Sequence, residues 1–266
     1  MPAINPTRLK QQTAQLAESF SNPPAFVRGL HNLFDMYAER ARRPGQSGMP
    51  APLIDAYKVH PPILRHILQD IIPQAAQNPD AGLALCDALW EQPYLEFRLL
   101  ASMLLGQVAP ESPKPVLERV QGWITTDLED YLIDALLTHG LAYLRLRYPQ
   151  TTVQLVQDWL DRSNIFYVQL GLRALLPMAD DPAFENLPAF FRLIHPLVRS
   201  APGMLRPNLL DVISKLAHRS PTETAYFLRQ TMLLPNSPDT PWLIRQSLGQ
   251  FPPEIEKGLR NAVRGL

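Results

Sequence analysis

The sequence predicts an all-α fold, a HEAT-like helical-repeat solenoid in which antiparallel helix pairs stack into an α-α superhelix. Apolar residues share helix faces at i, i+4, i+8 spacing, as do Leu95, Leu99, Met103 and Leu104, and no segment alternates for long with the period of two that marks a strand. Prolines number 28 in 266 residues, and most fall at the start or end of an expected helix. Successive helix pairs begin near residues 79, 113, 151, 183 and 221, a step of about 32 to 38 residues that is close to the unit of HEAT-type repeats.

The N-terminal region is set apart by a change in composition. Helices are expected at residues 8–20 and 24–41, where the apolar spacing is helical. Residues 44–52 then combine Gly, Ser and Pro without periodicity, which is typical of a mobile loop. The chain is therefore expected to divide into N-terminal helices with a loop, residues 1–52, and a repeat solenoid, residues 53–266.

The repeat region restarts short helices at regular intervals. Ser220 is placed as an N-cap, Pro221 in the first turn, and Glu223 where it can complete a capping box. Short connections such as Arg162-Ser163 make sequential helices antiparallel neighbours. The expected helices of this region lie at about 61–76, 79–91, 93–108, 113–124, 127–147, 151–162, 164–178, 183–199, 203–219, 221–234, 241–250 and 252–264.

The composition excludes several classes of protein. The 25 basic and 25 acidic residues cancel, so no net field draws the whole chain to nucleic acid or to an anionic membrane. Twenty of the 25 basic residues are arginines, which suit bidentate contacts with phosphates, although a genomic preference for arginine explains the same excess. No run of about 18 apolar residues is present, and residues 1–21 lack the apolar core of a signal peptide. A cytoplasmic protein without membrane contact is therefore expected.

The sequence gives no sign of a cofactor or metal site. Cys86 is the only cysteine, so no internal disulfide can form, and its apolar surroundings predict a buried, inert thiol. The six histidines do not have the spacing of metal ligands. Glycine-rich nucleotide loops, Walker loops and the Gly-x-Ser-x-Gly motif are absent from the sequence.

Four segments together resemble the AlkD-like DNA alkylation repair proteins, which are built of HEAT-like repeats. They are AYKVHPPILR at 56–65, LWEQPYLEFR at 89–98, WITT followed by an acidic helix from Asp127, and WLDRSNIFYVQLGLRA at 159–174. The resemblance implies removal of positively charged alkylated purines from DNA. In that family a concave basic surface holds the duplex, two tryptophans line a cleft, and an aspartate supports departure of the base, because a carboxylate stabilises positive charge developing on the deoxyribose.

Asp130 and Asp134 are the candidates for that aspartate, and they share one helix face at i, i+4 spacing. The alternative is that they only favour a helix N-terminus and otherwise face solvent. The sequence departs from the family at the other cleft positions. Where the family has a tryptophan, an arginine and a second tryptophan, this chain has Thr126 or Asp130, then Gln169, then Asp211.

Arginines from consecutive repeats are expected to lie along one surface and to follow a phosphate backbone, with an exposed aromatic pair beside them. The alternative is solvated arginines that form ion pairs with residues such as Asp158 and Asp161. The nucleic-acid-binding candidates are Arg145, Arg147, Arg162, Arg173, Phe166 and Tyr167.

These observations lead to two functional hypotheses. The first is a HEAT-repeat protein that binds double-stranded DNA and resembles DNA alkylation repair glycosylases, either as an active alkylpurine DNA glycosylase or as a divergent or inactive one. The second is a non-catalytic scaffold that binds a protein partner on its concave face.

Overall fold

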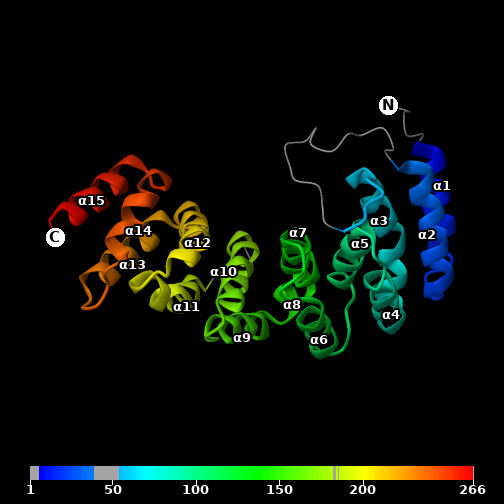
Figure 1. Ribbon diagram of the computed structural model, residues 1–266, viewed down its shortest axis with the longest axis horizontal. Coiled ribbons are helices and arrows are strands. Elements are labelled where there is room, and N and C mark those ends of the chain that lie inside the picture. Colours follow the sequence, from blue (N-terminus) through cyan, green and yellow to red (C-terminus); the bar gives the residue numbers. More distant parts are fainter. Residues whose placement is uncertain (1–5, 39–53, 182–183, 185, 266) are drawn as a thin grey trace. The chain divides into compact units, whose positions relative to one another are not determined.

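The computed structural model describes residues 6–38, 54–181, 184 and 186–265. Within these ranges all regular elements are helices, apart from an isolated bridge between Asp55 and Tyr94 (Figure 1). The predicted all-α helical-repeat fold is therefore confirmed. The loop expected at residues 44–52 and the division expected at residue 52 lie outside the described residues, and both stay predictions.

The chain forms two compact units, Met1–Tyr148 and Pro149–Leu266, and each is described by itself. The first unit contains α1 (Pro6–Ala17), α2 (Pro23–Tyr37), α3 (Pro61–Gln77), α4 (Pro79–Trp90), α5 (Leu95–Leu105), α6 (Lys114–Trp123), α7 (Asp130–Ala135), the π-helix η1 (Leu136–Gly140) and α8 (Ala142–Arg147). The second contains α9 (Pro149–Leu160), α10 (Ile165–Asp180), α11 (Leu187–Arg199), the 3-10 helix η2 (Gly203–Leu205), α12 (Arg206–Arg219), α13 (Pro221–Leu233), α14 (Thr240–Ser247), the 3-10 helix η3 (Leu248–Gln250) and α15 (Pro253–Arg264).

Polar contacts link positions one repeat apart in both units. In the first unit, Arg119 on α6 forms a two-pronged ion pair with Asp87 on α4, 32 residues earlier. In the second, Arg206 on α12 pairs with Asp239, 33 residues later. Stacked rings follow the same spacing, with Trp90 against Trp123 and Phe191 against Phe227. Such contacts between equivalent positions are how neighbouring helix pairs stack in a helical repeat; the HEAT type of this repeat stays a prediction.

The buried faces agree with the sequence pattern in one helix and differ in another. Leu209, Val212, Ile213 and Leu216 on α12 are all buried, as the spacing indicates. On α5 the expected face of Leu95, Leu99, Met103 and Leu104 is only partly right, because Leu104 is fully buried whereas the other three are half-buried. The buried residues of that helix include Phe97, Leu100, Ala101, Leu104 and Leu105. Because α5 is apolar on almost every side and packs on α3, α4 and η1, periodicity alone could not identify its face.

Two local predictions are also corrected. Ser220 is the N-cap of α13, but its side chain makes no capping hydrogen bond, and Thr224 donates to the Ser220 carbonyl instead. The helix expected at 127–147 is divided into α7, η1 and α8. The π-turn coincides with a close backbone approach, since a Cβ atom on Gly106 would lie 1.8 Å from the His139 carbonyl oxygen.

The single cysteine behaves as its apolar surroundings predict. Cys86 is free and fully buried on α4. Burial raises the pKa of its thiol well above the ordinary value, so the thiolate is not formed at neutral pH.

Candidate nucleic-acid interface and acidic helix

The acidic residues of the first unit lie at the start of α7. Asp130 is the first residue of the helix, Asp134 follows one turn later, and both side chains are exposed. Glu129, which precedes them, has a structural contact, because its Oε1 accepts a hydrogen bond of 2.6 Å from the Ile54 backbone N–H. Asp127 lies in the turn before α7, where a hydrogen bond with the Thr125 side chain lowers the pKa of its carboxyl. Among the described residues, no group of three acidic, histidine or cysteine side chains could hold a metal ion.

Arg145 and Arg147 follow on α8 in the same unit. Arg145 is 8% exposed, and its guanidinium donates to the carbonyl oxygens of Leu137 and Thr138, at 2.7 and 2.5 Å. These carbonyls belong to η1, so Arg145 supports the π-turn rather than presenting its charge to solvent. Burial and the Arg145 charge both lower the pKa of His139 on the same turn. Arg147, at the end of α8, is exposed.

The second unit brings three of the predicted residues together at the start of α10. Asn164 caps this helix by accepting a hydrogen bond of 3.0 Å from the Phe166 N–H. The Phe166 and Tyr167 rings meet edge to face with centroids 5.3 Å apart. The exposed guanidinium of Arg162 lies over the Tyr167 ring, 4.1 Å from its centroid. We call Arg162, Phe166 and Tyr167 the aromatic–arginine cluster.

Arg173 and Met204 lie near this cluster. Arg173 follows Phe166 by seven residues on α10, about two helical turns, so the two share a helix face. Gln169, between them, donates to the Met204 carbonyl oxygen at 3.3 Å and so joins α10 to η2. Met204 is 66% exposed. The sequence-based candidates did not include it, although a large apolar residue next to a glycine and two residues after a proline is a sign of an exposed turn.

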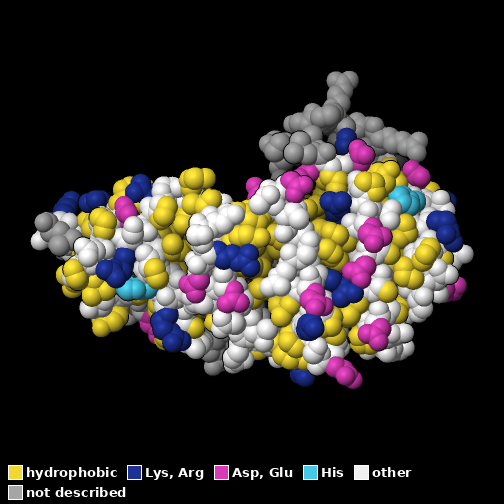
Figure 2. Space-filling view, turned by 60° about the horizontal axis from the view of Figure 1, so that its bottom comes forward, with side chains coloured by type: hydrophobic (Ala, Val, Ile, Leu, Met, Phe, Trp, Pro, Cys, Tyr) yellow, Lys and Arg dark blue, Asp and Glu magenta, His cyan; other side chains and the backbone are white. Residues whose placement is uncertain are grey.

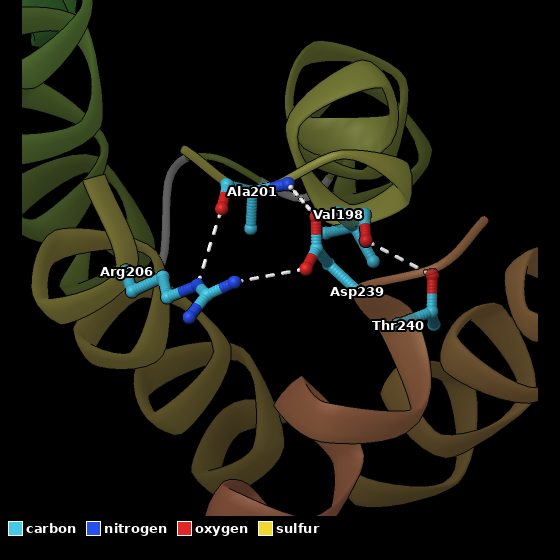
Figure 3. A network of polar contacts seen from close by, with 5 residues as sticks. All are labelled: Val198, Ala201, Arg206, Asp239 and Thr240. Atoms are coloured by element: carbon cyan, nitrogen blue, oxygen red, sulfur yellow. Dashed lines mark hydrogen bonds and ion pairs between the residues drawn. The ribbon is translucent and has the colours of Figure 1, made fainter. Parts of the chain in front are cut away.

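A polar network in the second unit joins the end of α11 to the starts of α12 and α14 (Figure 3). Arg206 donates to the Ala201 carbonyl oxygen and to the Asp239 carboxylate, and the other oxygen of that carboxylate accepts from the Ala201 N–H at 2.9 Å. Thr240 donates to the Val198 carbonyl oxygen. Arg206 also lies over the Trp242 ring, 4.6 Å from its centroid. Its guanidinium therefore has a structural role between repeats.

In the first unit, a buried carboxylate joins two of the four segments on which the family resemblance rests. Glu96, 4% exposed, accepts hydrogen bonds from the backbone N–H groups of Tyr57, Lys58 and Val59. Lys58 adopts a left-handed conformation with φ of 58° at this point. Burial and neighbouring charges raise the pKa of Tyr57 to about 12, and its hydroxyl lies 2.7 Å from His31 Nδ1. The motif glutamate thus holds a sharp loop, which the residue pattern alone did not reveal.

The surface charge is mixed. On the face drawn in Figure 2, basic and acidic side chains are interspersed among hydrophobic ones. This distribution agrees with the balanced composition of 25 basic and 25 acidic residues. Local clusters, rather than a broad basic field, must therefore supply any attraction for DNA on this face.

Comparison with known proteins supports the family resemblance. A sequence model of the DNA alkylation repair enzyme family matches residues 53–249. No curated protein and no solved structure matches significantly. No helix within the described ranges is long and apolar enough to cross a membrane. Because the family match covers most of its 266 residues, the chain belongs to the DNA alkylation repair enzyme family and has a role related to DNA repair.

Proposed function

We propose that this protein binds double-stranded DNA and that the aromatic–arginine cluster of the second unit contacts the duplex backbone. The observation that carries the proposal is the exposed Arg162 guanidinium stacked on Tyr167 at 4.1 Å. Stacking fixes the plane of the guanidinium and leaves its N–H edge available to a phosphate. Because the chain belongs to the DNA alkylation repair enzyme family, DNA is the ligand to test first.

The nearby acidic residues do not neutralise Arg162. Asp158 accepts a hydrogen bond from Gln154, and Asp161 accepts from Gln157, each one turn earlier on α9. No ion pair joins Arg162 to a carboxylate within the described residues. The alternative of an arginine paired with Asp158 or Asp161 is therefore not what the contacts favour, and the charge of Arg162 is available to a ligand.

A titration of labelled duplex DNA across a salt series tests the proposal. Phosphate contacts release counterions, so the affinity must fall steeply between about 50 and 200 mM salt. With phosphates bound by Arg162 and Arg173 of the second unit, the slope of log K against log salt is expected to be about −1.8, from about −0.9 per contact. Absence of binding at 50 mM salt would contradict the proposal.

The chemistry of base release is a second step of this proposal. The carboxylate of Asp130 or Asp134 would stabilise the positive charge that develops on the deoxyribose as a cationic base departs. Both side chains are exposed and lie on one face of α7, so a ligand in solution can reach either carboxylate. Asp130→Asn and Asp134→Asn each keep the side-chain shape and remove the charge. The variant that removes the reacting carboxylate should abolish release of methylated purine, while its duplex affinity stays within about twofold. If both variants still release the base, neither carboxylate supports base release.

One observation favours a protein-binding scaffold as a second candidate function. Tyr226 and Leu233 are 60% and 67% exposed on α13, and Leu234 after the helix is 43% exposed. Tyr226 and Leu233 are seven residues apart and share a helix face. Leu233→Ser is expected to release a stoichiometric protein partner without changing duplex affinity. An unchanged partner in a pull-down with Leu233→Ser would remove the support for this surface.

A further inference from the structure

A short turn with an apolar tip joins α11 to α12 in the second unit. Pro202, Gly203 and Met204 are consecutive exposed residues, and Met204 is 66% exposed. Ala201 and Leu205, on either side of them, are buried. A Cβ atom on Gly203 would have no atom of the described residues within 4 Å, apart from those of its chain neighbours. Residues 202–204, which we call the apolar tip, therefore stand clear of the surrounding side chains.

The base of this turn is held by hydrogen bonds. The Leu205 N–H donates to the Pro202 carbonyl oxygen at 2.8 Å and closes the turn. Arg206 donates to the Ala201 carbonyl oxygen at 3.1 Å, and the Asp239 carboxylate accepts from both Arg206 and the Ala201 N–H (Figure 3). The proline ring also fixes the backbone φ angle of Pro202. The apolar tip thus has its shape before a ligand binds, which reduces the conformational entropy lost on binding.

The apolar tip lies beside the face of α10 that includes Phe166 and Arg173. Gln169, which lies between these two residues at i+3 from the first and i−4 from the second, donates to the Met204 carbonyl oxygen at 3.3 Å. The segment around the tip, residues 199–208, contains two arginines and no acidic residue. An apolar tip among cationic side chains fits a ligand that is anionic outside and apolar within. Duplex DNA is such a ligand, because its phosphates surround stacked bases.

We propose that the apolar tip inserts at a base step in the minor groove of a bound duplex, with Met204 as the inserted side chain. Methionine and proline are among the apolar residues with which DNA-bending proteins partly unstack neighbouring base pairs. Unstacking costs least at flexible steps such as TA, and burial of the exposed Met204 side chain offsets part of that cost. The inference rests on the proposed DNA binding, and it adds that the protein selects sites by the deformability of the duplex.

A duplex with a single TA step between G·C pairs, carrying 2-aminopurine in place of the adenine of that step, tests the proposal. This base fluoresces more strongly when it is unstacked, so binding of the full chain should raise the fluorescence. Met204→Ser should abolish the increase and keep the salt dependence of binding, because the Met204 side chain contacts no phosphate. Met204→Leu keeps an apolar side chain at the tip and should retain the increase.

Met36→Ser is the matched control, because Met36 is a 53% exposed methionine on α2 of the first unit, and this variant should retain the full increase. Fluorescence that stays constant when the unsubstituted protein binds overturns the insertion, as does an increase that persists in Met204→Ser. Either of these results leaves the proposed DNA binding intact. Absence of duplex binding at about 50 mM salt overturns both proposals, so the two failures are distinguished.

Discussion

The buried charges Glu96 and Arg145 of the first unit and the exposed Arg162 of the second unit have opposite roles, although Arg206 of the second unit, like Arg145, binds a backbone carbonyl oxygen. In the first unit, Glu96 and Arg145 are buried and bind backbone groups of a loop and a π-turn. In the second, Arg162 lies outside the core on an aromatic ring. A charged side chain is buried where backbone N–H or C=O groups beside it lack another partner, because leaving such a group buried and unpaired is costly. Where the helix end is already capped, as by Asn164, the charge stays available for a ligand.

Glu96→Ala should give the largest loss of stability. It leaves the N–H groups of Tyr57, Lys58 and Val59 without their acceptor, and the free energy of unfolding should fall by about 3 to 5 kcal/mol. Glu118→Ala is the control, since this glutamate is exposed and forms only a surface pair with Lys114. The control should stay within about 0.5 kcal/mol in urea unfolding. Equal effects of the two variants would mean that Glu96 does not hold the loop.

The next largest loss of stability is expected from a substitution in the core-facing side of α5. Leu100→Ala removes a fully buried side chain and should cost about 2 to 5 kcal/mol, whereas Leu99→Ala, which is half-buried, should cost clearly less. Urea unfolding of the two variants measures the difference. A larger cost for Leu99 would restore the face that the periodicity predicted.

Arg145 and Arg162 provide a direct test of the inward and outward arginines. Arg145→Met breaks the hydrogen bonds to Leu137 and Thr138 and should cost about 2 to 3 kcal/mol. Arg162→Gln should change stability by less than about 0.5 kcal/mol, because its contact is at the surface. Thermal unfolding of both variants measures which loss of stability is larger, and a greater loss for Arg162→Gln would contradict the assigned roles of the two arginines.

The smallest expected effect is a pH dependence from His139. Its pKa is lower in the folded protein than the ordinary value of about 6.5, so the unfolded chain binds the proton more readily. The stability associated with neutral His139 is therefore present above about pH 6.5 and is lost as the pH falls toward the lower folded pKa. In His139→Gln, the free energy of unfolding should depend less on pH between about pH 5 and 7. A steeper profile in that variant would contradict the assignment.

The sequence predicted the features that depend on local spacing. Prolines, asparagine caps and apolar periodicity located most helices, and the short distance between Arg162, Phe166 and Tyr167 placed them at one helix start. It could not predict where Arg145 points, because that depends on the π-turn, at which Gly106 closely approaches the His139 carbonyl. The roles of Glu96 and Arg206 depend on contacts 33 to 39 residues away, which no local pattern contains.

The central claim, that Arg162 binds a DNA phosphate, is tested most directly by the salt dependence of duplex binding in Arg162→Gln. Loss of one phosphate contact should make the slope of log K against log salt shallower by about 0.9. Arg28→Gln, an exposed arginine of α2 in the first unit, is the control and should keep the slope of the unsubstituted protein. A slope unchanged in Arg162→Gln, with the protein folded and binding the duplex, would contradict the account.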